Sequence, residues 1–202
     1  MDIYGPYRDS MVRVMEGLAQ RIEACCDSYE REHGERLYEH LRQRIKSEES
    51  MTEKLRQRGL EPTPQNALRA VTDAIGLRVV CLFIDDVYET VERIRRFPGC
   101  RVVKEKDYIK NAKPNGYRSY HMILEVETAD PDVEGNTPGR YFVEIQLRTI
   151  AMDTWAALEH ELKYKRNISN PELITRELHR CANELAACDV SMQTMKRIIR
   201  EL

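Results

Sequence analysis

The residue types best suited to binding a phosphorylated ligand are concentrated at residues 110–125, in the sequence KNAKPNGYRSYHMILE. Lysine ammonium groups bind phosphate, and a flat tyrosine ring stacks on a nucleobase. Pro114 and the pair Asn115-Gly116 predict a tight turn that leads into a strand. Two interpretations stay open for this stretch alone: a cradle for a phosphorylated nucleoside, or a polar hairpin with a solvated cluster of charges.

Two predicted strands place polar side chains on one face. After the turn, apolar residues alternate with polar ones, so that His121 lies opposite the row of Met122 and Leu124. In the later segment YFVEIQLR, the same period of two separates an apolar face from a face with a carboxylate, an amide and a guanidinium: Glu144, Gln146 and Arg148. A solvent-exposed strand has the same pattern, but this strand is predicted to lie beside the basic turn.

A basic stripe follows one face of a predicted helix that begins after Ser47 and ends at Gly59. A serine and two cations recur at every fourth position beside an apolar stripe, and two more cations lie just before the helix, whose positive N-terminal end favours phosphate. The positions are Ser50, Lys54 and Arg58 on the helix, and Arg44 and Lys46 before it. The alternative is an ordinary amphipathic helix with a solvated basic edge.

A buried central strand is predicted from Leu77 to Ile84, where nearly every residue except Arg78 is apolar. Asp73 precedes this strand, at a place where a carboxylate either binds a metal or closes an Asx turn. The pair Asp85-Asp86 after the strand is interpreted as a helix start and not as a metal site.

The remaining segments predict helices and one long loop. Helical spacing of apolar residues occurs at residues 9–33, again from Leu37 to Ile45, and from Thr149 onward, where Ala151, Trp155, Leu158 and Leu162 face inward. A strand is predicted from Cys100 to Val103, and a loop from Thr128 to Gly139. The final helix, from Pro171, is long for its few apolar positions and is therefore a candidate for subunit packing.

Composition and charge narrow the class of protein. The chain of 202 residues is expected to form one domain. Its net charge of −2 argues against general binding of nucleic acids, whereas an excess of cations between residues 101 and 121 suits a small anionic ligand. No apolar run reaches membrane length, so we expect a cytoplasmic protein. The six cysteines lack CxxC spacing and are interpreted as reduced thiols.

Four long motifs resemble the synthetase domain of the RelA/SpoT family, over roughly residues 36–166. They are KSEESMTEKLRQRG, TDAIGLRVVCLFIDDVY, EKDYIKNAKPNGYRSYH and VEIQLRTIAMDTWAALEHELKYK, and the short chain resembles the small alarmone synthetases of that family. The resemblance implies transfer of pyrophosphate from ATP to the ribose 3′-hydroxyl of GDP or GTP, which makes the alarmones ppGpp and pppGpp. It also implies an α+β fold related to nucleotidyltransferases, with a mixed β-sheet flanked by helices, and with residues 9–33 and 171–202 as scaffold or oligomerisation helices.

The resemblance assigns roles to individual residues. Asp73 and Glu144 match the residues that hold Mg²⁺, and Glu144 also matches the base for the 3′-hydroxyl. The ATP side is matched by Arg44, Lys46, Ser50, Lys54, Arg58 and Arg78. The acceptor side is matched by Lys113, Asn115, His121 and Gln146, and by Tyr117 as the tyrosine that stacks on guanine. Pyrophosphoryl transfer needs a metal, cations and a carboxylate near the attacking hydroxyl, and residues for all three are present.

The resemblance has departures and leaves alternatives. Asp73-Ala74-Ile75-Gly76 stands where the family commonly has Asp-Ile-Ala-Gly, and the His-Asp pair of the family's hydrolase domain is missing, so synthesis without degradation is expected. Small members of the family form tetramers, which implies a homo-oligomer, and some bind their product at an allosteric site. One alternative is a toxin-like pyrophosphokinase acting on the tRNA 3′ end or on adenosine nucleotides, which would need a more extended basic surface for tRNA. The other is an inactive nucleotide sensor or RNA-binding module, although the two metal carboxylates argue against it.

Overall fold

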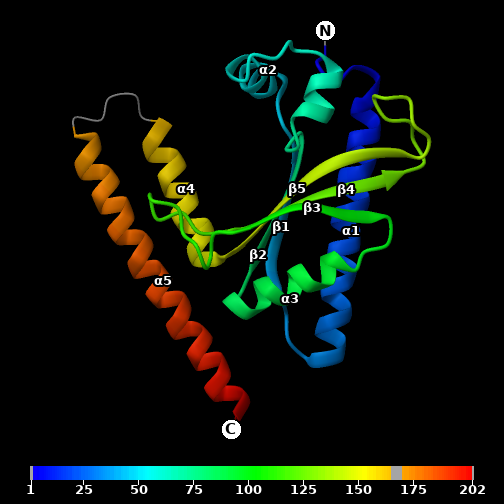
Figure 1. Cartoon of the computed structure of the whole chain (residues 1–202). Coiled ribbons are helices and arrows are strands. Elements are labelled where there is room, and N and C mark those ends of the chain that lie inside the picture. Colours follow the sequence, from blue (N-terminus) through cyan, green and yellow to red (C-terminus); the bar gives the residue numbers. More distant parts are fainter. Residues whose placement is uncertain (1, 165–169, 202) are drawn as a thin grey trace.

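The computed structural model describes residues 2–164 and 170–201 and is built on a mixed five-stranded sheet in the order β1-β2-β5-β4-β3 (Figure 1). The strands are β1 (Tyr38–Ile45), β2 (Ile75–Cys81), β3 (Cys100–Asp107), β4 (Tyr120–Thr128) and β5 (Gly139–Thr149). The helices are η1 (Gly5–Tyr7), α1 (Arg8–His33), α2 (Glu48–Gln57), the π-helical η2 (Asn66–Ala70), α3 (Ile84–Arg95), α4 (Ile150–Tyr164) and α5 (Pro171–Glu201). The predicted α+β fold is confirmed, while the expected end of the core at residue 166 lies outside the described residues.

The register of the sheet brings polar side chains together on one face. Strands β2 and β5 run parallel at the centre, with Gly76 opposite Glu144 and Arg78 opposite Gln146. Strand β4 runs antiparallel to β5 and places His121 opposite Gln146. Because side chains of a strand alternate between faces, these polar residues of three strands share one side of the sheet.

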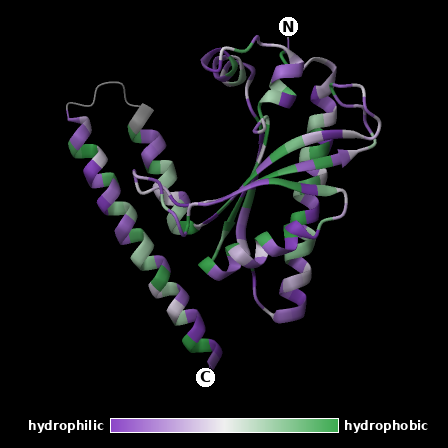
Figure 2. Ribbon diagram, in the orientation of Figure 1, coloured by the Kyte–Doolittle hydropathy of each residue, from purple (hydrophilic) through white to green (hydrophobic). Residues whose placement is uncertain are grey.

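The other face of the sheet forms the hydrophobic core with α1 and α3. Leu77, Met122 and Ile145 occupy neighbouring positions on the central strands and are at most 2% exposed, and Met11 and Ile22 of α1 are fully buried in the same cluster. Burial of one such side chain contributes about 1.5–3 kcal/mol, so this face holds the fold together. In Figure 2 hydrophobic residues follow the central strands, whereas α5 alternates between hydrophobic and hydrophilic residues. Within residues 2–164 and 170–201, no helix is both long and apolar enough to cross a membrane.

The prediction of a helix from Leu37 to Ile45 is wrong, because this segment forms the edge strand β1. It pairs antiparallel with β2 from Tyr38 to Ile45, with a shift of register between Tyr38 and His40. The polar Gln43 lies opposite Leu77, so the apolar residues do not alternate as a strand usually requires. Pairing with the unsatisfied edge of β2 outweighs the local pattern, as is common for strands.

Other boundaries differ in smaller ways. Strand β3 continues to Asp107, so the basic tract from Lys104 belongs to a strand, and β2 ends at Cys81 rather than Ile84. Leu158 was expected to face inward but is 47% exposed, because α4 leads away from the sheet and is accompanied there by α5 (Figure 1). The helix after Ser47 is confirmed as α2, and Ser47 caps it by accepting a hydrogen bond from the Ser50 backbone amide.

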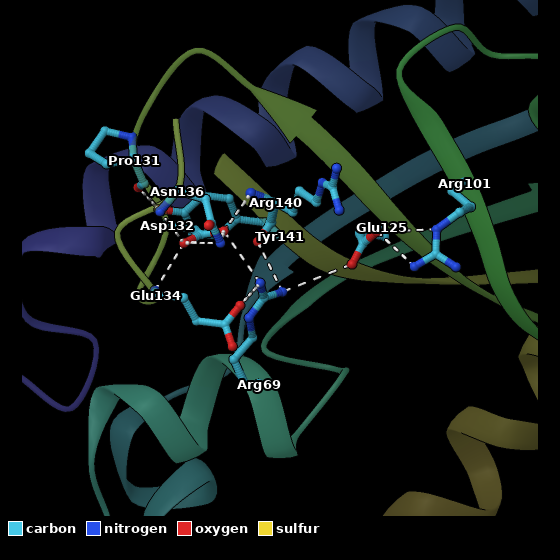
Figure 3. A network of polar contacts seen from close by, with 9 residues as sticks. All are labelled: Arg69, Arg101, Glu125, Pro131, Asp132, Glu134, Asn136, Arg140 and Tyr141. Atoms are coloured by element: carbon cyan, nitrogen blue, oxygen red, sulfur yellow. Dashed lines mark hydrogen bonds and ion pairs between the residues drawn. The ribbon is translucent and has the colours of Figure 1, made fainter. Parts of the chain in front are cut away.

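A polar network ties the loop between β4 and β5 to η2, just before Asp73 (Figure 3). The Asp132 carboxylate is buried and accepts hydrogen bonds from the backbone amides of Glu134 and Asn136. Arg69 of η2 donates to Asp132 Oδ2 at 3.3 Å, pairs with Glu134, and lies over the Phe142 ring at 5.6 Å from its centroid. Since these contacts join η2 to a loop 63 residues later in the sequence, Arg69 fixes the connection that enters β2.

Candidate active site

Two cavities on the polar face of the sheet share a wall formed by Asp73 and Glu144. The first has a volume of about 250 Å³ and is lined by Arg42, Gln43, Arg44, Asp73, Gly76, Leu77, Arg78, Glu144 and Gln146. The second has a volume of about 270 Å³ and is lined by Lys54, Arg58, Thr72, Asp73, Lys104, Glu105, Lys106, Tyr108, Lys113, His121, Ile123 and Glu144. Two ligands bound in these cavities would therefore meet at the two carboxylates.

The Asp73 carboxylate is held by two lysines and has one free oxygen. Its Oδ2 atom accepts hydrogen bonds from Lys46 Nζ at 2.9 Å and Lys54 Nζ at 2.5 Å. Its Oδ1 atom is buried and has no hydrogen-bond partner among the described residues. Burial raises the pKa of Asp73, but the bonds from Lys54 and Lys46 outweigh burial, so that the pKa is lowered and the group is charged at neutral pH.

Glu144 lies on β5 between a histidine and an amide. Its Oε1 atom is 3.3 Å from His121 Nδ1, and its Oε2 atom accepts a hydrogen bond from Gln146 Nε2 at 2.9 Å. Burial raises the pKa of Glu144, and the negative charge of Asp73 raises it further, but His121 and Gln146 dominate and the net pKa is lowered. Glu144 is thus a carboxylate at neutral pH, close enough to Asp73 for the two charges to repel.

The carboxylates fit a magnesium site. Asp73 and Glu144 repel each other, and Asp73 Oδ1 is buried without a partner among the described residues. A cation bound between the two carboxylates would stabilise both. Among the residues that the structure describes, no group of three or more His, Cys, Asp or Glu side chains is arranged to hold a metal. Mg²⁺ does not need such a cage, because it usually binds one or two carboxylates and completes its shell with water and substrate phosphates.

The residues predicted for ATP are divided between the cavities. Arg44 and Arg78 line the first cavity. Burial, followed by repulsion from Arg148, lowers the pKa of Arg78. Lys54 and Arg58 line the second cavity. The two other predicted residues lie nearby: Lys46 binds the Asp73 carboxylate, and Ser50 lies in the capped first turn of α2.

Of the residues predicted for the acceptor, two line the second cavity, two lie in the adjoining turn and one lines the first cavity. Lys113 and His121 line it, and Lys113 Nζ is 4.6 Å from the centroid of the Tyr117 ring. The Tyr117 hydroxyl is 2.8 Å from His121 Nε2. Asn115 shapes the turn, because its Oδ1 atom accepts a hydrogen bond from the Tyr117 amide. Gln146, in contrast, lines the first cavity.

Three residues of this region were not among the predicted site residues. Arg148 is 4% exposed, and its guanidinium donates to the Tyr117 hydroxyl at 2.7 Å, to Gln146 Oε1 at 2.8 Å and to Asp153 Oδ1 at 3.0 Å. Asp153 also lies 3.2 Å from Arg78 Nη1 and so links the two sides of the site. The alternation of β5 already placed Arg148 on the polar face, but no sequence signal distinguished Asp153 or Tyr108, whose ring contacts Tyr117 and His121.

Comparison with known proteins identifies relatives over most of the chain. A family model described as "Region found in RelA / SpoT proteins" matches residues 43–169. A Bacillus subtilis protein named GTP pyrophosphokinase YwaC is 38% identical over 183 residues, which cover 91% of this chain and 85% of the relative. The crystal structure of small alarmone synthetase 2 from B. subtilis covers 93% of this chain and 95% of its own, at 35% identity and a TM-score of 0.81. Small alarmone synthetase 1 of the same organism, bound to its product pppGpp, covers 96% and 95%, at 31% identity and a TM-score of 0.81.

Proposed function

Since the chain belongs to the RelA/SpoT family, we propose that it is a GTP diphosphokinase that transfers pyrophosphate from ATP to the ribose 3′-hydroxyl of GDP or GTP. The products are AMP and the alarmones ppGpp or pppGpp. The observation that supports this reaction best is the pair of cavities that meet at Asp73 and Glu144, because two nucleotides bound in them would be separated only by this carboxylate wall.

ATP occupies the first cavity in this proposal. Arg44 and Arg78 present planar guanidinium groups there, which can stack on a base and bind phosphate oxygens. Lys46 and Lys54 lie at the wall, 2.9 and 2.5 Å from Asp73 Oδ2, where the charge of the transferred pyrophosphoryl group develops. Arg58 of α2 lines the second cavity, on the other side of Asp73, and Ser50 lies in the first turn of α2; we assign both to the ATP side on the family resemblance alone.

The guanine nucleotide occupies the second cavity. Tyr117 stacks on guanine, and Lys113, which lies over the Tyr117 ring, binds the 5′-phosphates. Lys104 and Lys106 add positive charge to the same cavity, whereas Asn115 holds the turn in shape. A cavity of about 270 Å³ with cations along one side suits a nucleotide better than a tRNA end, for which a more extended basic surface would be needed.

Glu144 acts at the acceptor hydroxyl. Its lowered pKa keeps it ionised at neutral pH, and it accepts the proton of the 3′-hydroxyl as the bond from that oxygen to the β-phosphorus of ATP forms. The bond between the β-phosphorus and the oxygen that bridges it to the α-phosphate breaks, and AMP leaves. Mg²⁺, when bound by Asp73 and Glu144, neutralises phosphate charge and orients the pyrophosphoryl group.

We also propose that the protein is a cytoplasmic homo-oligomer, with a tetramer as the expected form. Several large apolar side chains of α5 are exposed in the single chain, which supports packing against another copy. They are Val190 at 58%, Met195 at 55%, Ile198 at 53% and Ile199 at 73% exposed. Sedimentation of the purified protein measures the oligomeric state directly.

Transfer of label from γ-labelled ATP tests the proposed reaction. The purified protein is incubated with Mg²⁺ and, separately, with GDP, GTP, ADP and bulk tRNA, and labelled ppGpp or pppGpp is expected with the guanine nucleotides. Label only on tRNA or on an adenosine nucleotide would identify a toxin-like pyrophosphokinase, and absence of transfer would favour a nucleotide sensor. Glu144→Gln is the matched control: it is expected to fold normally and to lose nearly all transfer, and turnover like that of the wild type would contradict the role of Glu144.

A further inference from the structure

The turn that contains Tyr117 rests directly on α5, a helix that contributes no residue to either of the two cavities. Arg118 Nη1 donates hydrogen bonds to the carbonyl oxygens of Gly116 at 3.1 Å and Ala182 at 3.2 Å. Arg118 Nη2 donates to Asn183 Oδ1 at 3.3 Å. The guanidinium therefore connects the turn to the middle of α5.

The backbone of the turn also packs closely against α5. Gly116 has a φ of +90°, and a Cβ atom at this position would lie 2.6 Å from Ala182 Cβ and 3.6 Å from His179 Cα. Ala182 itself is only 4% exposed. Only a glycine in the turn facing a small residue in the helix permits this approach.

Helix α4 also supports the turn. We call the surface of α4 and α5 that contacts the turn, formed by Glu159, Ala182 and Asn183, the seat. Asn115 Nδ2 donates to Glu159 Oε1 at 2.6 Å, and Trp155 Nε1 donates to the Leu178 carbonyl at 2.7 Å, which joins α4 to α5. The turn thus lies against two helices that are bonded to each other. A larger side chain on α5 is therefore expected to displace the turn relative to the second cavity, because α4 occupies the space on the other side.

The seat determines where the acceptor-binding side chains lie. The Gly116 amide donates to the Lys113 carbonyl at 2.8 Å, and the Lys113 amide donates to the Tyr117 carbonyl at 3.1 Å, so the turn moves as one unit. The Tyr117 ring is 6.3 Å from that of Trp155, and its hydroxyl meets Arg148. Displacement of Gly116 would consequently shift both Tyr117 and Lys113 relative to the second cavity.

We propose that Ala182, Asn183 and Arg118 are positioning residues for the acceptor nucleotide, and that α5 is thereby part of the specificity apparatus of the enzyme. This inference rests on the proposed function. Because the first cavity is lined by β1, β2 and β5 and not by the turn, the seat affects the acceptor and leaves ATP binding unchanged. A loss of affinity for one substrate only distinguishes positioning from a general loss of structure.

The seat can be altered without detaching α5. Further along the helix, Lys196 Nζ lies 2.5 Å from Asp86 Oδ1, and Arg197 Nη2 lies 3.0 Å from Asp85 Oδ2, so ion pairs with α3 anchor the C-terminal part separately. Ala182→Leu adds volume where Gly116 packs. Ala187→Leu makes the same change at an exposed position of the same helix and is the matched control.

Steady-state kinetics of the two variants test the proposal. Ala182→Leu is expected to raise the KM for GDP about tenfold or more, with the KM for ATP unchanged within about twofold, because small displacements of positioning groups have large effects. Ala187→Leu is expected to behave as the wild type. Equal KM values for GDP in both variants, or a parallel rise for ATP and GDP in Ala182→Leu, would overturn the proposal.

Binding measured without turnover separates this proposal from the proposed function. Trp155, the single tryptophan of the chain, lies beside Tyr117 and α5, so its fluorescence reports GDP binding in the absence of ATP. We expect Ala182→Leu to need about tenfold more GDP than Ala187→Leu for half-maximal change, with unaltered circular dichroism. If the wild type binds GDP but transfers nothing, the proposed function is wrong, and the comparison of the two variants still tests whether the seat positions the acceptor nucleotide. Equal GDP affinities in the two variants would refute that positioning role.

Discussion

Replacing Asp73 by asparagine tests the electrostatic design of the site. The carboxylate neutralises two ammonium groups, those of Lys46 and Lys54, whose side chains are only 15% and 29% exposed. An asparagine has nearly the same shape but no charge. The variant therefore leaves two positive charges close together in a partly buried place, and it also removes one of the two proposed metal ligands.

The cost to stability follows from the burial of the pair. Removing one partner of a buried ion pair costs about 3–5 kcal/mol, because the remaining charge is left uncompensated. Since both lysines keep some contact with water, screening reduces the expected cost for Asp73→Asn to about 2–3 kcal/mol. For a chain of this length, that corresponds to a fall in melting temperature of about 4–12 °C.

A double-mutant cycle checks the explanation. Unfolding is measured in the presence of a chelator for Asp73→Asn, Lys54→Met and the double variant, and a favourable coupling of about 1–2 kcal/mol is expected, because removing Lys54 relieves the repulsion. Asp130→Asn is the control, since Asp130 pairs at the surface with Arg13, which is 57% exposed, and the loss of this pair should destabilise the protein less than Asp73→Asn does.

The stability result and the activity result are separate. The reasoning about charge is refuted if Asp73→Asn and Asp130→Asn destabilise the protein equally, or if the double variant shows no coupling. Pyrophosphate transfer by Asp73→Asn is expected to fall by about 10³-fold or more, because a metal ligand is lost at the reacting phosphate. Transfer near the wild-type rate would remove Asp73 from the mechanism whatever its effect on stability.

Three further predictions concern other parts of the molecule. Arg69→Met is expected to lower the free energy of unfolding by about 1–3 kcal/mol in urea titrations, because the buried Asp132 carboxylate of the β4–β5 loop loses its cationic partner, and an unchanged midpoint would contradict this. Arg148→Met should raise the KM for the guanine nucleotide more than the KM for ATP, since Arg148 donates a hydrogen bond to the Tyr117 hydroxyl. An equal rise of both KM values would contradict this role of Arg148. The pKa values of Asp73 and Glu144 are lowered by folding, so the two carboxylates stabilise the folded state above the unfolded pKa of about 4. This stabilisation is lost as the pH falls through the folded pKa values. In the double variant Asp73→Asn, Glu144→Gln, the free energy of unfolding should therefore fall less steeply with decreasing pH than in the wild type.

Local patterns predicted the elements whose residues all agree with one kind of structure. The alternation that placed His121 opposite Met122 is confirmed in β4, and Ser47 caps α2 as its sequence indicated. The segment from Leu37 to Ile45 was predicted as a helix because its apolar residues are three and four positions apart. It forms a strand because the backbone of β2 needs a partner along that edge, and this requirement is not visible within the segment itself.

Residue types and the family resemblance together predict the residues of the proposed site. The sequence places carboxylates, cations and a tyrosine on predicted turns and strand faces, and the resemblance to a family gives them roles. What residue types could not indicate was the pairing of side chains. Arg148 with Tyr117, and Asp73 with both Lys46 and Lys54, are contacts between segments whose distance depends on the order of the strands.

The sequence by itself determined the kinds of group that are available and the faces on which they lie, because the periodicity of helices and strands is a local property of the chain. Only the tertiary structure decided that Asp73 and Glu144 form one wall between two cavities, since that arrangement requires β2 and β5 to pair in parallel in one register. It likewise decided that α5 supports the turn at Gly116. That contact depends on how closely two backbones approach, which no pattern of residue types records.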